Sequence, residues 1–347
     1  MNAGKSAAAF WLISISPHAD SSRGAIPVSA MADAKRPLAI VADAFCKEHN
    51  TGPGHPEQAA RFDAVLQGLQ AEGLLDSALR IQPIATQSAQ LERVHTRAYL
   101  ELAKSEIESG EDQLSTGDTT IGPHSWEAAL RAAGSVLAGV DTVLTGKAAR
   151  AFCVVRPPGH HASPDRGMGF CILNNVALAA RHAQAVHGVG RVLIVDWDVH
   201  HGNGTQDAFY SDPSVFFFST HQSPWYPGTG AAGETGAGGG KGTTLNCPLP
   251  AGSGRAEVFA AFEDKLLPAM EAFRPELVLI SAGFDSREND PLGQFTLKDK
   301  DFADLTGMML ALAQKHSAGR VVSVLEGGYN LTGLASAAAA HAAALAR

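Results

Sequence analysis

The chain has 347 residues, of which 45% are hydrophobic, enough for one large α/β domain or two smaller ones. Its formal net charge of −8 and its lack of a basic block exclude a sequence-independent grip on nucleic acid or on an anionic membrane, so we expect neither as a direct partner. The four cysteines have no CxxC spacing and indicate free thiols in a reducing compartment, which favours a cytoplasmic location.

Residues 1–36 differ in character from the rest of the chain. They contain the apolar stretch AAAFWLISIS, which is too short to span a membrane, in a Ser-rich region with few acids, as in targeting peptides. Translation from Met31 gives MADAKRPLAIV, which leads directly into the first predicted strand. We expect residues 1–36 to be a disordered or mis-assigned leader, with organelle targeting as the alternative, and residues 37–347 to form one domain.

Regular elements are predicted from residue 37 onward. A first strand is predicted at 37–45, and a first helix starts near Glu57. Two further helices are predicted at 91–107 and 125–144, with a polar loop at 109–122 between them. Short apolar runs then alternate with helical patterns, which is typical of βαβ units. The runs cover 151–155, 192–195, 215–218, 277–280 and 321–325, and the helices cover 174–187, 256–273, 298–315 and 331–345. The prediction is a three-layer αβα domain with a mainly parallel sheet and its ligand site at the carboxyl ends of the strands.

The stretch RVLIVDWDVHHGNGTQ at 191–206 contains a dense group of metal-binding side chains. Residues 192–195 predict a buried strand, and residues 202–204 predict the turn that ends it. Asp196, Asp198 and His200 alternate, so in an extended chain they point to one face, as a cation site requires. The alternative is that these carboxylates cap loop amides.

Asp285 ends another predicted strand and can complete a three-ligand site with an open position for water. Mixed oxygen and nitrogen ligands suit Zn²⁺, with Fe²⁺, Co²⁺ and Mn²⁺ as alternatives.

Two adjacent histidines are the candidates for acid–base chemistry. His160 and His161 follow a Pro-Pro-Gly turn, and their alternative role is packing within a loop. Asp196 and Asn203 are available to orient the two rings. Tyr329 follows two glycines and can direct its hydroxyl at a developing oxyanion.

Seven separate motifs in this chain resemble those of the histone deacetylase family. They are GPGHPE at 52–57, RPPGHHA at 156–162, GFCILNNVA at 169–177, VDWDVHHGNGTQ at 195–206, YPGTG at 226–230, SAGFD at 281–285 and EGGYN at 326–330. The resemblance covers roughly residues 39–345 and is to the branch of class II enzymes, bacterial histone deacetylase-like amidohydrolases and acetylpolyamine amidohydrolases. It implies an arginase-like α/β catalytic domain with one Zn²⁺ held by Asp198, His200 and Asp285.

The resemblance also implies roles for the other site residues. His161 is expected to act as general base and acid, with His160 as its electrostatic partner held by Asp196, and the Tyr329 hydroxyl is expected to bind the substrate carbonyl. An acyl-lysine channel is implied between Phe170 and Tyr226, lined by Gly169 and Leu292, with Asp118 holding the substrate backbone. A structural K⁺ is implied near Asp196, Asp198, His200 and Ser219.

Two residues depart from part of that family. Asn203 stands where class I enzymes have aspartate, which agrees with class II and predicts a less basic His161. Tyr226 stands where many relatives have phenylalanine, which leaves the preferred acyl chain open.

The leading hypothesis is a zinc-dependent amidohydrolase that removes acetyl or a similar acyl group from an amine. Acyl-lysine peptides, acetylpolyamines and small acylated amines share the reacting amide and are all candidate substrates. The alternatives are a metal-bound acyl-ligand sensor with little turnover and an arginase-like ureohydrolase with two metal ions. A homo-oligomer is also expected.

Overall fold

One sheet of eight parallel strands organises the chain, in the order β2-β1-β3-β8-β7-β4-β5-β6. The computed structural model describes Met1, residues 36–83 and residues 85–347, and Arg36–Arg347 form one compact unit. The hypotheses about the leader, residues 1–36, fall almost wholly on residues 2–35, which lie outside the described residues. Among the described residues, no helix is both long enough and apolar enough to cross a membrane.

The strands and helices have the following bounds. The strands are β1 (Leu38–Ala42), β2 (Leu79–Ile81), β3 (Arg150–Val154), β4 (Val192–Asp196), β5 (Val215–Gln222), β6 (Thr244–Leu249), β7 (Leu277–Ala282) and β8 (Val321–Leu325). The α-helices are α1 (Ala60–Ala71), α2 (Leu74–Ser77), α3 (Ser88–Leu91), α4 (Arg97–Ser109), α5 (Ser125–Leu144), α6 (Asn175–His187), α7 (Asn203–Phe209), α8 (Arg255–Ala261), α9 (Leu267–Phe273), α10 (Asp299–His316) and α11 (Leu331–Leu345). Short helices of other types are η1 (Ala44–Glu48), η2 (Gly238–Gly240) and η3 (Phe262–Leu266).

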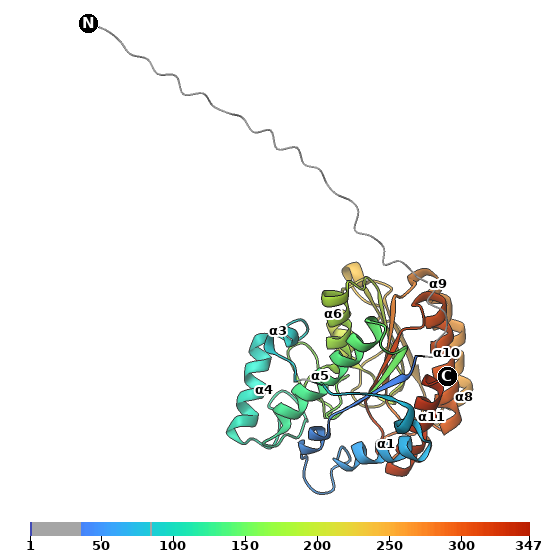
Figure 1. Cartoon of the computed structure of the whole chain (residues 1–347), viewed down its shortest axis with the longest axis horizontal. Helices are drawn as coiled ribbons and strands as arrows, with labels where there is room; N and C mark the ends of the chain where they lie inside the picture. The colour runs from blue at the N-terminus through green and yellow to red at the C-terminus, as the bar shows by residue number, and fades with distance from the viewer. Residues whose placement is uncertain (2–35, 84) are drawn as a thin grey trace. The chain divides into compact units, whose positions relative to one another are not determined.

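Helices cover both faces of the sheet, so the three-layer prediction is confirmed (Figure 1). On one face α5 packs on β1, β3 and β8, and α6 packs on β7. On the other face α1 and α11 pack on β3, and α10 packs on β7. The central strands β4, β7 and β8 are buried along their whole length, as their continuous apolar runs predict for a parallel sheet.

Two edge strands, one helix and one turn differ from the sequence prediction. The strand β2 has only three residues, and β6 contains Pro248, so neither has the long β-branched run of a central strand. The helix predicted at 91–107 begins later, at Arg97, because Thr96 starts α4 by accepting a hydrogen bond from the Tyr99 amide, and α3 already ends at Leu91. The turn predicted at 202–204 is wrong, since α7 begins at Asn203.

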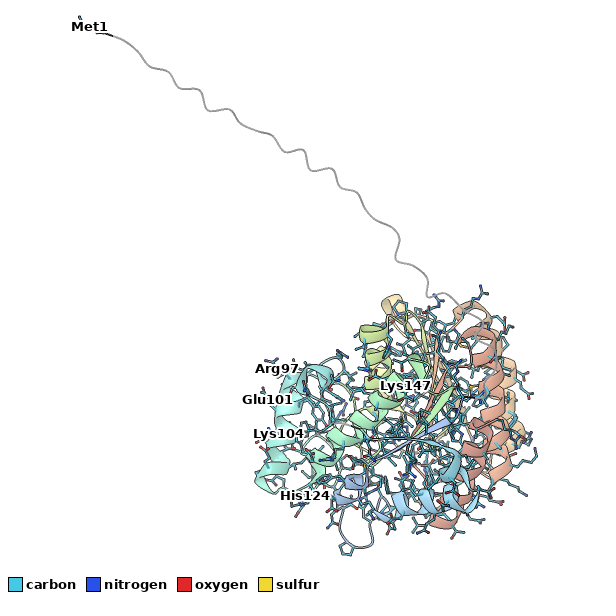
Figure 2. The ribbon with its side chains drawn as sticks, viewed as in Figure 1. Met1, Arg97, Glu101, Lys104, His124 and Lys147 are labelled. Carbon is cyan, nitrogen blue, oxygen red and sulfur yellow. The ribbon has the colours of Figure 1, made fainter. Side chains whose placement is uncertain are left out.

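Helix α4 has a small core of its own that positions one of the site loops. Its exposed face carries Arg97, Glu101 and Lys104 (Figure 2), and its buried face carries Tyr99. The Tyr99 hydroxyl donates to the Ile172 carbonyl oxygen at 2.6 Å. This contact ties α4 to the loop before α6, and Leu114 and Ile121 of the polar loop share an apolar cluster with Tyr99 and Ile172.

Several histidines are buried in the neutral form, and we expect them to make the protein less stable as the pH falls below about 6.5. Burial lowers the pKa of His341 to about 3 and that of His95 to about 4, from a usual value of 6.5. The unfolded chain therefore binds these protons at a higher pH than the folded chain does, and each histidine lowers the free energy of unfolding by roughly 1 kcal/mol per pH unit in that range. Urea denaturation at several pH values measures the slope.

The control is a His341→Gln variant. His341 contacts the hydroxyl groups of Thr306 at 2.6 Å and Ser323 at 2.8 Å, and a glutamine amide keeps one donor and one acceptor. This variant should show a shallower pH dependence than the parent. An identical slope in both proteins would contradict the assignment.

Candidate active site

The loops that leave β3, β4, β7 and β8 meet at the carboxyl ends of the strands, as predicted for a parallel sheet. The strand β8 lies between β3 and β7, and β4 lies on the other side of β7. Segments that are far apart in the chain therefore contribute to one site.

Two carboxylates and one imidazole converge at the centre of this edge. Asp198, His200 and Asp285 are buried, and each offers one ligand atom within 4.8 Å of the others. The His200 Nδ1 atom lies 3.0 Å from Asp198 Oδ1 and 3.2 Å from Asp285 Oδ2. Two oxygen ligands and one nitrogen ligand with room for a fourth group suit a divalent ion such as Zn²⁺.

The Asp285 carboxylate shows that these residues fit a cation. Its Oδ1 accepts a hydrogen bond from the Val199 amide at 2.9 Å, whereas its buried Oδ2 makes no hydrogen bond of acceptable geometry within the described chain. Burial and the neighbouring Asp198 carboxylate raise the pKa of Asp285 to about 7. Two buried carboxylates this close together are costly, and a bound cation relieves both the desolvation and the repulsion.

Glycines on two neighbouring loops leave space for the carboxylates. A Cβ atom at Gly283 would overlap the Asp198 carboxylate, and one at Gly327 would overlap those of Asp198 and Asp285. The Gly327 amide also donates to Asp198 Oδ2 at 2.8 Å. Any larger side chain at these positions would displace the candidate ligands.

Asp196 lies behind this cluster and is not part of it. The strand β4 ends at Asp196, and the backbone bends at 198–200, so the alternation expected of an extended chain does not continue. Asp196 Oδ1 accepts from the Asp198 amide at 3.1 Å, and its Oδ2 lies 2.9 Å from His160 Nδ1. The expectation that Asp196 shares a cation-facing side with Asp198 and His200 is therefore wrong, while its pairing with His160 agrees with the resemblance.

The two histidines have opposite electrostatic environments. Burial disfavours the charged form of His160, but the Asp198 and Asp196 carboxylates outweigh it and raise the pKa of this ring well above its usual value. Burial, with positive charge at His160 and His200, holds the pKa of His161 well below its usual value. His161 Nδ1 lies 2.8 Å from Asn203 Oδ1, a neutral partner. These shifts favour a neutral His161, which can accept a proton, beside a positively charged His160.

Glu326 is a site residue that sequence reasoning missed, although it begins the EGGYN motif. Its Oε2 accepts from the amides of Gly159 at 2.7 Å and His160 at 3.2 Å, which ties the histidine loop to the end of β8. Burial raises the pKa of Glu326 to about 7.

A buried arginine pair behind the tyrosine loop was also missed. Both oxygens of Glu57 accept from Arg156, at 2.5 and 2.7 Å, and Oε1 also accepts from Arg61 at 3.0 Å. Arg61 Nε donates to the Gly328 carbonyl oxygen at 2.6 Å, and its guanidinium lies 4.9 Å from the centre of the Tyr329 ring. Their motifs pointed to two of these residues, because Glu57 ends GPGHPE and Arg156 begins RPPGHHA.

A pocket of about 220 Å³ leads from the surface to the cluster. Its lining contains every predicted channel residue and, in addition, Trp225; the residues are Asp118, His161, Gly169, Phe170, His200, Trp225, Tyr226, Leu292 and Tyr329. Trp225 Nε1 donates to the Leu292 carbonyl oxygen at 2.8 Å. Asp118 Oδ1 accepts from the Gly169 amide at 2.7 Å and from the Tyr226 hydroxyl at 3.1 Å. The rim and the wall of the pocket are therefore linked by hydrogen bonds.

An all-parallel sheet with this cluster at the base of a narrow pocket defines an α/β protein with a candidate metal centre. A model of the family described as "Histone deacetylase domain" matches residues 55–345. Histone deacetylase 14, chloroplastic, from Arabidopsis thaliana is 40% identical over 301 residues, which cover 82% of this chain and 71% of the relative. Histone deacetylase-like amidohydrolase from Pseudomonas aeruginosa is 40% identical over 318 residues, covering 85% of this chain and 82% of the relative.

The fold leads to the same family. The crystal structure of the HDA15 HD domain superposes with a TM-score of 0.83 and 36% sequence identity, and the match covers 88% of each chain. The chain therefore belongs to the histone deacetylase family.

Proposed function

We propose that this chain is a zinc-dependent amidohydrolase that removes acetyl or a similar acyl group from acyl-lysine or another acylated amine. The observation that carries the proposal is the convergence of Asp198, His200 and Asp285 at the base of a narrow pocket, where the buried Asp285 Oδ2 makes no hydrogen bond within the described chain and lies 3.2 Å from the His200 ring nitrogen. Asp198, His200 and Asp285 would hold the ion. A divalent ion bound there polarises an amide carbonyl and lowers the pKa of water.

The chain's own residues supply the proton transfers and the oxyanion contact. His161 is held neutral and lines the pocket, so it can take a proton from the attacking water and deliver it to the departing amine. His160, oriented by Asp196, supplies a fixed positive charge beside it. Burial raises the pKa of Tyr329 well above its usual value, so the hydroxyl keeps its proton and can donate to the carbonyl oxygen as negative charge develops there.

The pocket suits a linear acyl-amine chain. Phe170 and Tyr226 line it together with Leu292, and such apolar walls fit a methylene stem. At the rim, Asp118 Oδ2 makes no hydrogen bond to the described residues and can accept from a substrate N–H group, as the resemblance implies. A structural K⁺ near Asp196 and Ser219, which are paired in register on β4 and β5, remains part of the proposal.

Turnover of an acetyl-lysine peptide, acetylputrescine and acetylspermidine should be measured side by side, with and without a zinc chelator. We expect hydrolysis of at least one substrate, loss of turnover with the chelator, and recovery on adding Zn²⁺. Full turnover by metal-free protein would overturn the proposal. Two Mn²⁺ per chain would favour the ureohydrolase alternative, and tight acyl-ligand binding without any product would favour the sensor.

Asp290 is expected to position Tyr329 without touching the substrate. Its Oδ2 accepts from the Tyr329 amide at 2.7 Å and the Asn330 amide at 3.1 Å, and its Oδ1 accepts from the Leu292 amide at 2.9 Å. In Asp290→Asn an NH₂ group replaces one acceptor, so the tyrosine loop shifts and kcat should fall roughly 10- to 100-fold. Metal content and KM should change little. A fall in metal content equal to the fall in kcat would show that the variant acts by losing metal and not by moving Tyr329.

A further inference from the structure

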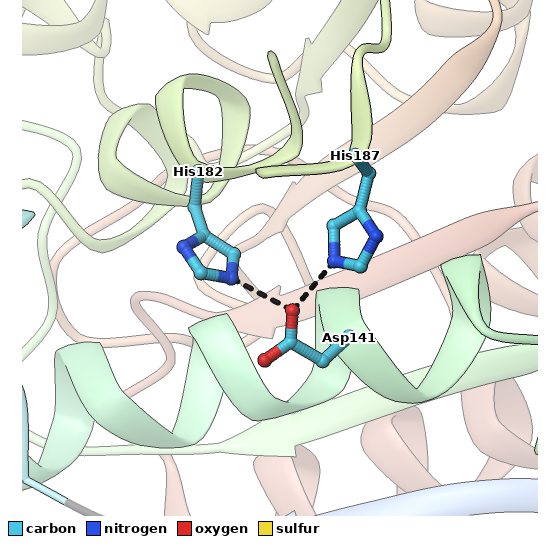
Figure 3. A group of neighbouring side chains, drawn as sticks. All are labelled: Asp141, His182 and His187. Atoms are coloured by element: carbon cyan, nitrogen blue, oxygen red, sulfur yellow. Dashed lines mark hydrogen bonds and ion pairs between the residues drawn. The ribbon is translucent and has the colours of Figure 1, made fainter. Parts of the chain in front are cut away.

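A second group of potential metal ligands lies on the flank of the domain, between α5 and α6. Asp141 comes from α5, and His182 and His187 come from the last two turns of α6 (Figure 3). Asp141 Oδ1 lies 2.7 Å from His182 Nε2 and 2.6 Å from His187 Nε2. Each ring thus directs its own Nε2 atom at Asp141 Oδ1.

The surroundings of this group combine rigidity with access to solvent. The His182 side chain is only 6% exposed and that of His187 17%, whereas Asp141 is 48% exposed. Asp141 also lines a cavity of about 370 Å³. His187 is the last residue of α6, which Gly188 terminates, and the partial negative charge at a helix carboxyl end favours a cation.

We propose that Asp141, His182 and His187 form a second metal site, for Zn²⁺ or another late first-row divalent ion, that fastens α6 to α5. Two imidazole nitrogens and one carboxylate oxygen are a ligand set that such ions prefer, with water from the adjacent cavity in the fourth position. Metal–ligand distances of about 2.0–2.1 Å place tetrahedral ligand atoms about 3.3 Å apart, so each His–Asp pair must open by roughly 0.7 Å. The half-exposed Asp141 side chain has the freedom to do this.

Arg93 is the residue that opposes metal binding at this site. Its Nη1 atom lies 3.3 Å from His182 Nδ1, and because arginine can only donate, Nδ1 is an acceptor and the ring proton sits on Nε2. A metal ion needs the Nε2 lone pair, so the proton must move to Nδ1 and Arg93 must turn away. Its positive charge also repels a cation. Removal of Arg93 should therefore tighten binding, although it removes a hydrogen bond from the cluster.

The test counts the Zn²⁺ ions bound per chain by equilibrium dialysis. A titration then measures how tightly the second ion binds. We expect about two ions per chain in the parent, one in His187→Ala and one in Asp285→Asn, which keeps the flank site but lacks a catalytic ligand. Arg93→Ala should bind the second ion at least about fivefold more tightly than the parent. His316→Ala is the matched control, because His316 pairs with Glu271, away from the flank cluster, and its loss should leave the count unchanged.

Melting temperature gives a second readout. Excess Zn²⁺ should raise it in the parent and in Asp285→Asn but much less in His187→Ala, since the ion binds only the folded cluster. His187→Gln serves if the alanine variant does not fold.

An equal count in parent and His187→Ala, or no ion retained by Asp285→Asn, would overturn the proposal and leave the cluster as a hydrogen-bonded contact between the helices. Weaker binding in Arg93→Ala would overturn the assigned role of that residue. This site is separate from the catalytic one, so turnover in His187→Ala should equal that of the parent.

Discussion

An Asp285→Asn variant is expected to lose the catalytic metal ion and to lower kcat/KM by at least about 10³-fold. The amide keeps the size of the side chain and an oxygen to accept from the Val199 amide, but it places a neutral NH₂ group where the carboxylate oxygen facing His200 now lies. A neutral amide binds a divalent ion far more weakly than a carboxylate. Metal content and kcat/KM, measured on the same preparation, check the expectation.

The fold should survive this substitution. In metal-free protein the Asp285 and Asp198 carboxylates repel each other, so Asp285→Asn is expected to be at least as stable as metal-free parent. Asp301→Asn is the control, because Asp301 is a buried carboxylate at the start of α10 and lies in a different part of the chain. Retention of the metal and of activity in Asp285→Asn would contradict the proposed centre.

A Tyr329→Phe variant is expected to keep its metal and to lose roughly 10²- to 10³-fold in kcat. The substitution removes only the hydroxyl, and the ring keeps its contacts with Phe170, at 5.9 Å between ring centres, and with Arg61. The lost hydrogen bond is one that strengthens as charge develops on the oxygen, so kcat should fall while KM changes little. Steady-state kinetics on the preferred acylated substrate measures both.

Tyr226→Phe provides the matched control, since it removes a hydroxyl from the same pocket. That hydroxyl donates to Asp118 at the rim and not toward the cluster. We expect a change in KM and in the preferred acyl chain, with kcat within about threefold of the parent. A comparable loss of kcat in both variants would show that the loss of either hydroxyl from the pocket lowers kcat. It would contradict the specific role of Tyr329.

The sequence predicted the central strands better than the edges. The strands β4, β7 and β8 are buried on both faces, so their apolar runs are continuous and their boundaries were placed within two residues. The edge strands β2 and β6 have partly exposed, mixed sequences, so no periodicity distinguishes them from loop. The start of α7 was missed because Gly202 and Gly204 resemble a turn, although Gly204 is needed for its close approach to the backbone of Ala162.

By itself, the sequence determined which kinds of side chain follow each buried strand. This is a local property, because hydrophobic periodicity marks the strand and the next few residues form its loop. Only the tertiary structure decided which of those side chains meet. It joined Glu326 to the histidine loop, since β8 lies between β3 and β7. It also brought Asp141 against two histidines of α6, a contact that depends on helix packing rather than on any motif.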